Sequence, residues 1–125
     1  MKTFFSENHK LRDANTELYG GELVKPFERP QRLDFFVEEI KKRDLGEILS
    51  PNKIDLKIIN KVHDHEYVKF LESAWNEWIK EGFKGEAIPT VWPSRSMNSD
   101  KIPTFIEGKL GYYCLAGETS ISNGS

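Results

Sequence analysis

The segment from residue 65 to residue 80 constrains the fold most, because its apolar side chains recur at intervals of three and four residues. This spacing predicts a helix of about four turns with one broad apolar face. Asp64 directly precedes the segment and has a side chain suited to cap a helix by accepting backbone N–H bonds. The apolar face comprises Tyr67, Val68, Leu71, Trp75, Trp78 and Ile79. Such a face is stable only when another part of the protein covers it.

Two further helices and one strand are predicted before this segment. The short apolar run at 2–6 is typical of a strand, and a loop at 15–30 that contains glycine and proline separates it from a helix beginning at Pro30. A short second helix follows Asp55, which is placed to cap it. The apolar positions are Leu33, Phe36, Val37 and Ile40 in the first helix and Leu56, Ile58 and Ile59 in the second. These helices need a common layer to pack against.

The segment 82–107 shows no sustained period and contains prolines that exclude a regular helix, namely Pro89, Pro93 and Pro103. A connection of this length inside a small domain is usually functional or mobile. Residues 108–121 then predict another helix, although each of the three glycines in that range weakens it by roughly 1 kcal/mol. We therefore expect a long loop followed by a weakly specified helix.

Composition narrows the function classes without naming one. The 125 residues fit one domain, and a hydrophobic content of 38% suffices for a core. With 18 Lys and Arg against 20 Asp and Glu, the net charge of −2 gives no overall attraction for nucleic acid or anionic lipid. No apolar stretch approaches the ~20 residues that span a bilayer, and the opening residues lack the apolar run of a secretion signal. We therefore expect a cytoplasmic protein with neither a nucleic-acid nor a membrane partner.

The sequence His-Asp-His-Glu at 63–66 is the one histidine cluster. Two metal-ligating histidines on a helix must be three or four residues apart to share a face, whereas His63 and His65 are two apart. This spacing favours a structural role, in which Asp64 caps the helix and at least one histidine makes a structural hydrogen bond. The single cysteine, Cys114, has no identifiable histidine partner, so we expect a small buried apolar side chain rather than a nucleophile.

Two carboxylates are more suggestive of a binding site. Glu107 and Glu118 are eleven residues apart in the sequence, or three helical turns, so a continuous helix would place both on one face. Tyr112 and Tyr113 lie between them, and an acidic and aromatic lining suits a cationic ligand. The alternative is an ordinary solvated helix face, which is the usual environment of Glu. The residues alone favour this alternative.

Several longer segments resemble the bacterial acetylpolyamine amidohydrolases, which belong to the histone deacetylase superfamily. They are Phe-Phe-Ser-Glu at 4–7, His-Lys-Leu-Arg at 9–12, Thr-Glu-Leu-Tyr-Gly-Gly-Glu-Leu at 16–23, Gly-Glu-Ala-Ile at 85–88 and Ile-Glu-Gly-Lys-Leu-Gly-Tyr-Tyr at 106–113. The similarity continues along essentially the whole chain with little shift in spacing. Departures are modest, and Phe105 and Lys109 fall at variable positions of the family.

The resemblance implies a zinc-dependent enzyme with the α/β fold of the arginases and deacetylases, a parallel sheet with helices on both faces. This chain would supply a mostly helical portion with a short first strand and a long loop. In that family two Asp and one His hold zinc, a His pair serves as acid and base, and a Tyr polarises the acetyl carbonyl. The present sequence contains no His-His pair and no Asp-x-Asp-x-His segment. We therefore expect residues 1–125 to be the N-terminal portion of the enzyme, with no catalytic or metal-ligating residue, and to be inactive and zinc-free alone.

The resemblance also implies substrate-facing positions. Glu17 and Tyr19 would lie near the mouth of the active site, Glu107 would be the rim carboxylate that hydrogen-bonds substrate, and Glu118 would lie deeper and favour cationic amines. The segment 82–107 would be the inserted loop that narrows the tunnel and forms a contact in a homodimer. Helices that cover absent strands should expose apolar stripes, such as Trp75 with Trp78 or Phe36 with Ile40, and such stripes favour association.

Two other functions remain open at this point. The chain could be an assembly or binding module that keeps the dimer loop and has no chemistry of its own. Alternatively, the enzyme could deacetylate other acylated amines or acyl-lysine. A reading frame that continues into the zinc and histidine motifs would favour the enzyme over the module, and only substrate profiling separates the two kinds of deacetylase.

Overall fold

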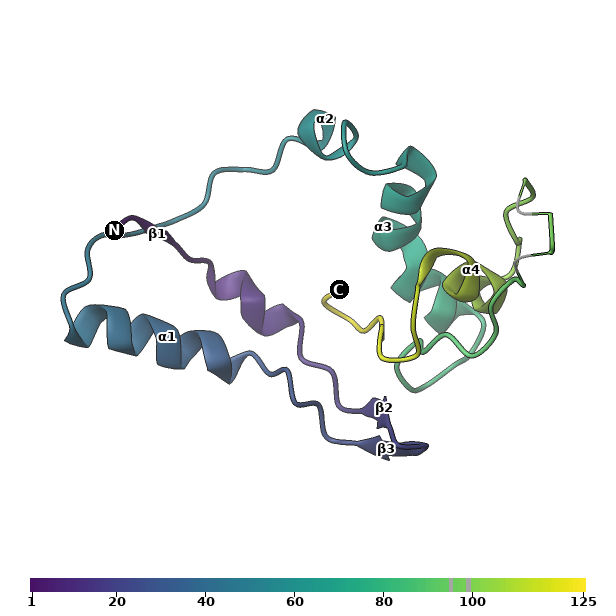
Figure 1. The fold of residues 1–125 in the computed structure, drawn as a ribbon, viewed down its shortest axis with the longest axis horizontal. Helices are drawn as coiled ribbons and strands as arrows, with labels where there is room; N and C mark the ends of the chain where they lie inside the picture. Colours follow the sequence, from purple (N-terminus) through teal and green to yellow (C-terminus); the bar gives the residue numbers. More distant parts are fainter. Residues whose placement is uncertain (95, 99) are drawn as a thin grey trace.

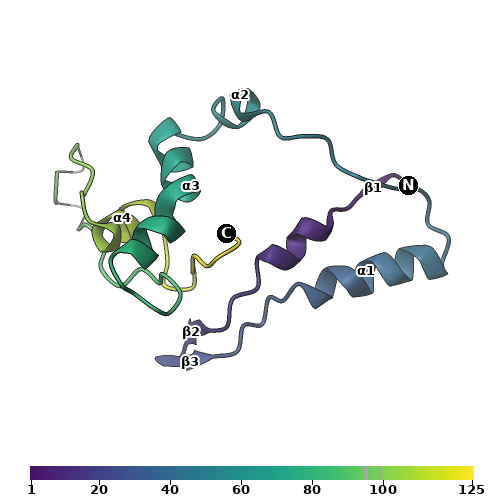
Figure 2. The same cartoon turned by 180° about the vertical axis from the view of Figure 1, so that it is seen from behind.

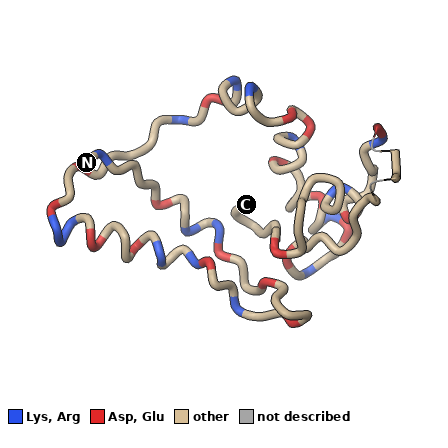
Figure 3. Tube along the Cα trace, in the orientation of Figure 1, with Lys and Arg blue, Asp and Glu red and all other residues tan. Residues whose placement is uncertain are grey.

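The computed structural model describes residues 1–94, 96–98 and 100–125. The two residues left out, Arg95 and Ser99, belong to the predicted loop at 82–107, so the prediction for that loop is tested only outside them. The chain forms an open N-terminal arm, residues 1–49, and a denser C-terminal cluster, residues 65–122, which are joined by a connection that carries one short helix (Figures 1 and 2). Acidic and basic residues are interspersed along both parts (Figure 3).

The arm contains two small sheets and two helical segments. Its elements are β1 (Thr3–Phe4), the 3-10 helix η1 (Glu7–Leu11), β2 (Glu17–Tyr19), β3 (Glu22–Val24), α1 (Gln31–Lys42) and β4 (Ile48–Leu49). β1 pairs with β4 in parallel, with Thr3 opposite Ile48 and Phe4 opposite Leu49. The predicted N-terminal strand is therefore confirmed, and the hairpin and α1 lie on the crossover between its two parallel strands.

The loop predicted for 15–30 is wrong over residues 17–24, where β2 and β3 form an antiparallel hairpin. Its turn residues Gly20 and Gly21 have φ of 61° and 85°, the left-handed conformation that two-residue hairpin turns require. Each strand has only three residues, which is too short for an alternating pattern to stand out. The adjacent glycines were the available signal for the hairpin.

The connection and the cluster contain α2 (Leu56–Ile59), α3 (His65–Lys80) and α4 (Ile106–Tyr113). The predicted caps are confirmed: Asp55 Oδ1 accepts from the Lys57 backbone N–H at 2.9 Å, and Asp64 Oδ1 accepts from those of Glu66 and Tyr67 at 2.9 and 3.0 Å. Between α3 and α4, the described residues contain no helix, as the prolines predict. Among the residues placed, no helix is long and apolar enough to cross a membrane.

The helix predicted for 108–121 is wrong in its second half. α4 ends at Tyr113, and Cys114 has an extended backbone with φ −96° and ψ 135°. The following residues return toward the loop, where Ala87 and Ile121 form an antiparallel bridge with backbone hydrogen bonds of 2.9 and 3.0 Å. Gly117 lowers the helix propensity of this segment. The bridge gives the N–H and carbonyl groups of Ile121 hydrogen-bond partners outside a helix. Glu107 and Glu118 consequently do not lie on one continuous helix.

The buried core lies between α3, α4 and the segments that flank α4. It consists of Phe70, Ala74, Ala87, Ile106, Leu110, Cys114 and Ile121. Tyr113 stacks on Phe70 with 4.7 Å between the ring centroids. Cys114 is buried as predicted, and burial raises the pKa of its thiol. A Cβ at Gly111 would collide with the Val91 carbonyl, so the loop approaches α4 closely at this glycine.

The arm, by contrast, leaves much apolar surface exposed. None of the 12 described residues of α1 is buried, and Phe36 is 59% exposed. Phe4 on the parallel pair β1–β4 is 63% exposed, although parallel sheets are normally covered on both faces. Of the two predicted stripes, exposure is confirmed at Phe36, whereas Ile40, Trp75 and Trp78 are only partly exposed. The Trp78 ring stacks on the Phe83 ring with 3.9 Å between their centroids.

Candidate functional site

The predicted mouth residues Glu17 and Tyr19 lie on β2, where alternate residues point to the same side of a strand. Glu17 Oε2 accepts a hydrogen bond of 3.3 Å from the Phe27 backbone N–H. Tyr19 is 64% exposed, and its ring contacts the Phe27 ring edge to face, with 5.5 Å between centroids. Phe27 is therefore a member of this site that periodicity did not single out. The pair offers an aromatic surface beside a carboxylate.

The other two predicted mouth residues lie on different parts of the cluster. Glu107 is exposed in the first turn of α4, where a negative charge complements the positive end of the helix dipole. Glu118 is exposed in the irregular segment after α4. The structure therefore distributes the four predicted residues over β2, the start of α4 and the segment after α4.

An open groove of about 680 Å³ lies where the start of α3 meets the end of α4. Its lining residues are His63, Asp64, Glu66, Tyr67, Ile102, Tyr112, Tyr113, Leu115 and Thr119. The rings of Tyr67 and Tyr113 are 6.0 Å apart. Burial, and next the negative charge of Glu66, raise the pKa of Tyr113. Tyr112 and Tyr113 thus line a groove with acidic residues, but these are Asp64 and Glu66 rather than Glu107 and Glu118.

The histidine cluster lies at the edge of this groove. Asp64 is occupied as the helix cap, as predicted, and the His63 ring lies 6.1 Å from that of Tyr67. The structural hydrogen bond predicted for one histidine stays a prediction. Over the described ranges, no three His, Cys, Asp or Glu side chains are grouped so that they could hold a metal ion. The residues that the structure describes therefore do not fit the zinc that the family resemblance implies.

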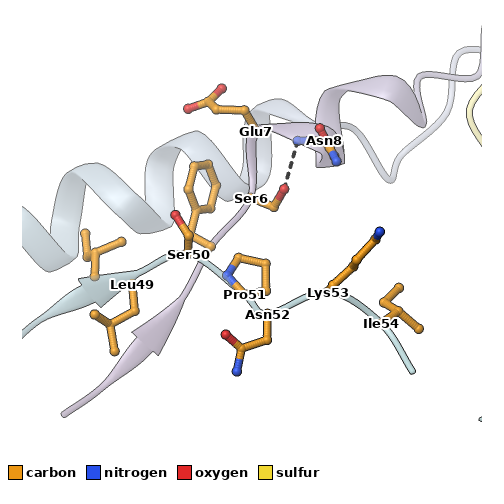
Figure 4. Close-up of a pocket in the computed structure, with 11 residues that line it drawn as sticks. Ser6, Glu7, Asn8, Leu49, Ser50, Pro51, Asn52, Lys53 and Ile54 are labelled. Carbon is orange, nitrogen blue, oxygen red and sulfur yellow. Dashed lines mark hydrogen bonds between the residues drawn. The ribbon is translucent and has the colours of Figure 1, made fainter. Parts of the chain in front are cut away.

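A second groove, of about 1010 Å³, lies at the carboxyl ends of β1 and β4 (Figure 4). Ligands often bind beyond this end of parallel strands. Here, however, the lining comes mainly from apolar and neutral polar side chains between Phe5 and Asn8 and between Ile48 and Ile54. Its carboxylate, Glu7, is paired with Lys10 at 2.6 Å, and the Ser6 hydroxyl oxygen accepts from the Asn8 N–H at 3.2 Å. We therefore do not assign chemistry to this groove.

Glu86 is a further polar residue that the sequence pattern did not single out. Its carboxylate accepts hydrogen bonds from the Asn15 backbone N–H at 2.8 Å, the Asn15 side-chain amide at 3.1 Å and the Thr16 hydroxyl at 2.7 Å. Burial opposes ionisation of Glu86, but these hydrogen bonds outweigh burial and lower the pKa of its carboxyl. The partners are 71 and 70 residues away in the sequence, so no local pattern could reveal them. The only signal was membership of the family segment at 85–88.

The chain is similar along its whole length to three curated proteins. No family model matches the chain. Over all 125 residues it is 50% identical to acetylpolyamine amidohydrolase of Mycoplana ramosa and 34% identical to acetylpolyamine amidohydrolase 2 of Pseudomonas aeruginosa. It is also 35% identical to acetylpolyamine amidohydrolase 1 of Pseudomonas aeruginosa. In each case the chain covers 36% of the relative, so it spans about a third of the length of the curated relatives it matches.

A solved structure shares the fold. The whole chain superposes on 36% of acetylpolyamine aminohydrolase from Burkholderia pseudomallei, with a TM-score of 0.84 and 23% sequence identity. This match confirms the predicted fold class, a mostly helical portion with a small parallel sheet. The sequence resemblance is confirmed as well, and the covered share is consistent with an N-terminal portion. Over its whole length, the chain is therefore homologous to part of the acetylpolyamine amidohydrolases.

Proposed function

We propose that this chain is the N-terminal portion of a zinc-dependent amidohydrolase that hydrolyses acetylpolyamines to acetate and the free amine. The observation that carries the proposal is the 50% identity, over the whole chain, with a protein named acetylpolyamine amidohydrolase. The matched region covers all 125 residues, so it includes positions 17, 19, 107 and 118. In this proposal the chain contributes binding residues rather than catalytic ones.

The substrate-binding contribution is the recognition of a cation. Polyamines carry ammonium groups at neutral pH, because an unperturbed alkylamine has a pKa near 10. The exposed carboxylates of Glu107 and Glu118 and the half-buried carboxylate of Glu17 attract such groups electrostatically. The exposed Tyr19 ring, steadied by Phe27, offers a cation–π contact of roughly 0.5–1 kcal/mol. The acidic mouth would therefore select charged acetylated amines over neutral ones.

The zinc of the longer enzyme would have to be held by residues outside this chain, since the described residues include no suitable ligand group. Bound zinc would supply the activated water and the stabilisation of the oxyanion. No step that we assign to this chain depends on the metal. We accordingly propose that the isolated 125 residues release no acetate.

The exposed apolar surface of the arm supports the proposal that this chain is part of a larger folded protein. Parallel strands and amphipathic helices are stable when covered, and Phe4, Leu33 and Phe36 have little cover in this chain. We propose that further parts of the enzyme cover this surface. We also propose that the enzyme is a cytoplasmic homodimer in which the loop at 82–107 contributes to the contact.

The test compares the chain with a longer protein that continues as its relatives do. Acetate release from acetylputrescine and acetylspermidine is measured for both proteins, with zinc content determined by elemental analysis. We expect turnover and about one zinc per chain for the longer protein, as for a single catalytic metal site, and neither for the 125 residues. Turnover by the 125 residues, or a longer protein that binds zinc but deacetylates acyl-lysine peptides and not acetylpolyamines, would overturn the proposal.

A further inference from the structure

Two groups of hydrogen bonds join the N-terminal arm to the C-terminal cluster. In the first, Glu86 of the cluster accepts the three bonds from Asn15 and Thr16 described above. In the second, Arg12 Nη2 of the arm donates to the Ser120 carbonyl at 2.9 Å and to the Ser120 hydroxyl at 3.3 Å. Glu86 thus uses both carboxylate oxygens to hold one short stretch of the arm.

This stretch leads directly into a part of the candidate mouth. Thr16 is followed at once by β2, whose Glu17 and Tyr19 are two of the predicted mouth residues. Because the Asn15 backbone N–H is itself a donor to Glu86, the bond fixes the main chain at the entry to the strand. A shift of Glu86 would therefore move Glu17 and Tyr19 relative to the cluster.

The residue after Glu86 holds the other side of the mouth. Ala87 exchanges two backbone hydrogen bonds with Ile121, at 2.9 and 3.0 Å. Ile121 is three residues after Glu118, and Ser120 N–H donates to the Glu118 carbonyl at 3.1 Å. The carboxylate of Glu86 therefore binds the segment that leads to Glu17. The backbone of the next residue, Ala87, binds the segment that follows Glu118.

We propose that Glu86 is a positioning residue of the substrate mouth, which sets the placement of Glu17 and Tyr19 relative to Glu118. The inference rests on the proposed function, because it concerns recognition of the cationic part of an acetylated amine. Glu86 makes no contact with substrate in this account. Its effect passes through the entry to β2.

A charged acceptor is well suited to this task. Hydrogen bonds to an ionised carboxylate are roughly twice as strong as those between neutral groups. Glu86→Gln keeps the shape and one acceptor oxygen, which can still bind the Asn15 N–H, but its amide nitrogen cannot accept from the Thr16 hydroxyl. Glu86→Ala removes both acceptors. The two variants should therefore form a graded series, with the alanine variant more affected.

The experiment has two readouts. In the 125-residue chain, amide hydrogen exchange is followed at Asn15, with Glu72→Ala, an exposed position of α3, as the matched control. In the longer enzyme, kcat and KM are measured for acetylputrescine and for N-pentylacetamide, in which a methyl group replaces the ammonium.

We expect exchange at Asn15 to be about tenfold faster in Glu86→Ala, less so in Glu86→Gln and unchanged in Glu72→Ala. In the enzyme, we expect Glu86→Ala to raise KM for acetylputrescine roughly fivefold, with kcat and the KM for N-pentylacetamide nearly unchanged. Equal losses on both substrates, unchanged kinetics or unchanged exchange would each overturn the positioning role. A wild-type enzyme that acts on neither substrate would instead overturn the proposed function. In that case, the amide hydrogen exchange at Asn15 would still test whether Glu86 holds this part of the main chain.

Discussion

Lys109 Nζ donates to Glu77 Oε2 at 2.6 Å, so an ion pair joins α4 to α3 beside the buried core. Ser73 donates to the other oxygen of the same carboxylate at 2.7 Å. The hydrogen bond from Lys109, and next that from Ser73, lower the pKa of Glu77. This pair fixes the orientation of the short helix that presents Glu107, and it directs the positive charge of Lys109 toward α3.

Replacing this lysine tests how much the pair contributes. Lys109→Met keeps the aliphatic stem and removes the ammonium, and we expect the free energy of unfolding to fall by about 1 kcal/mol, because both side chains are still partly exposed and solvent screens their attraction. Urea denaturation measures the loss. In a double-mutant cycle with Glu77→Gln, the two losses should not add, whereas simple additivity would contradict an interaction between these residues.

Glu86 predicts a specific pH dependence of stability. Its pKa is lower in the folded chain than the ordinary value, so the unfolded state binds more protons in the interval between the two. The stabilisation by this carboxylate should be fully present above the ordinary Glu pKa and should disappear as the pH falls through the lowered one. Urea denaturation at several pH values should therefore show a difference between wild type and Glu86→Gln that is constant near neutrality and shrinks in acid. A difference that grows in acid would contradict this assignment.

The close approach of the loop to α4 predicts a large effect at Gly111. Gly111→Ala places a methyl group against the Val91 carbonyl, and we expect a destabilisation of roughly 1–3 kcal/mol despite the better helix propensity of alanine. The Trp92 indole, which donates to the Cys114 carbonyl at 2.9 Å, should report displacement of the loop by its fluorescence. Gly85→Ala is the matched control, because a Cβ there meets nothing within 4 Å. Equal behaviour of the two variants would show that the loop does not rest on α4.

The exposed apolar face of α1 predicts self-association of the isolated chain. We expect dimers or larger species at micromolar concentration. The double variant Leu33→Ser/Phe36→Ser should shift the population toward monomer, because it removes apolar surface that is exposed to water in the monomer. Light scattering measures the mass. A wild-type chain that is strictly monomeric under these conditions would rule out this role for the face.

How far the sequence predicted the fold can be seen at the ends of its helices. Asp64 and the stripe from Tyr67 to Ile79 determined α3 to the residue, because capping and amphipathic spacing are local properties. The end of α4 could not be predicted in the same way. The end of the helix depends on the antiparallel bridge between Ala87 and Ile121, which are 34 residues apart in the sequence. Such pairing leaves no periodic signal in the sequence.

The candidate site shows the same difference between what local sequence patterns predict and what they do not. The resemblance supplied Glu17, Tyr19, Glu107 and Glu118 as residues, and periodicity supplied a wrong geometry for the last two. Periodicity singled out neither Phe27, whose partner Glu17 is 10 residues away, nor Glu86, whose partner Thr16 is 70 residues away. Local physics thus predicted elements, whereas the arrangement of the mouth depends on long-range hydrogen bonds.

The most direct test of the acidic mouth is the substrate preference of the longer enzyme. The measurement is the ratio of kcat/KM for acetylputrescine to kcat/KM for N-pentylacetamide, in wild type, Glu107→Gln, Glu118→Gln and the control Glu72→Gln. We expect the ratio to fall roughly fivefold in the first two variants, about 1 kcal/mol of lost attraction for the ammonium, and to stay unchanged in the control. An unchanged preference for the cationic substrate in both Glu107→Gln and Glu118→Gln would contradict the account.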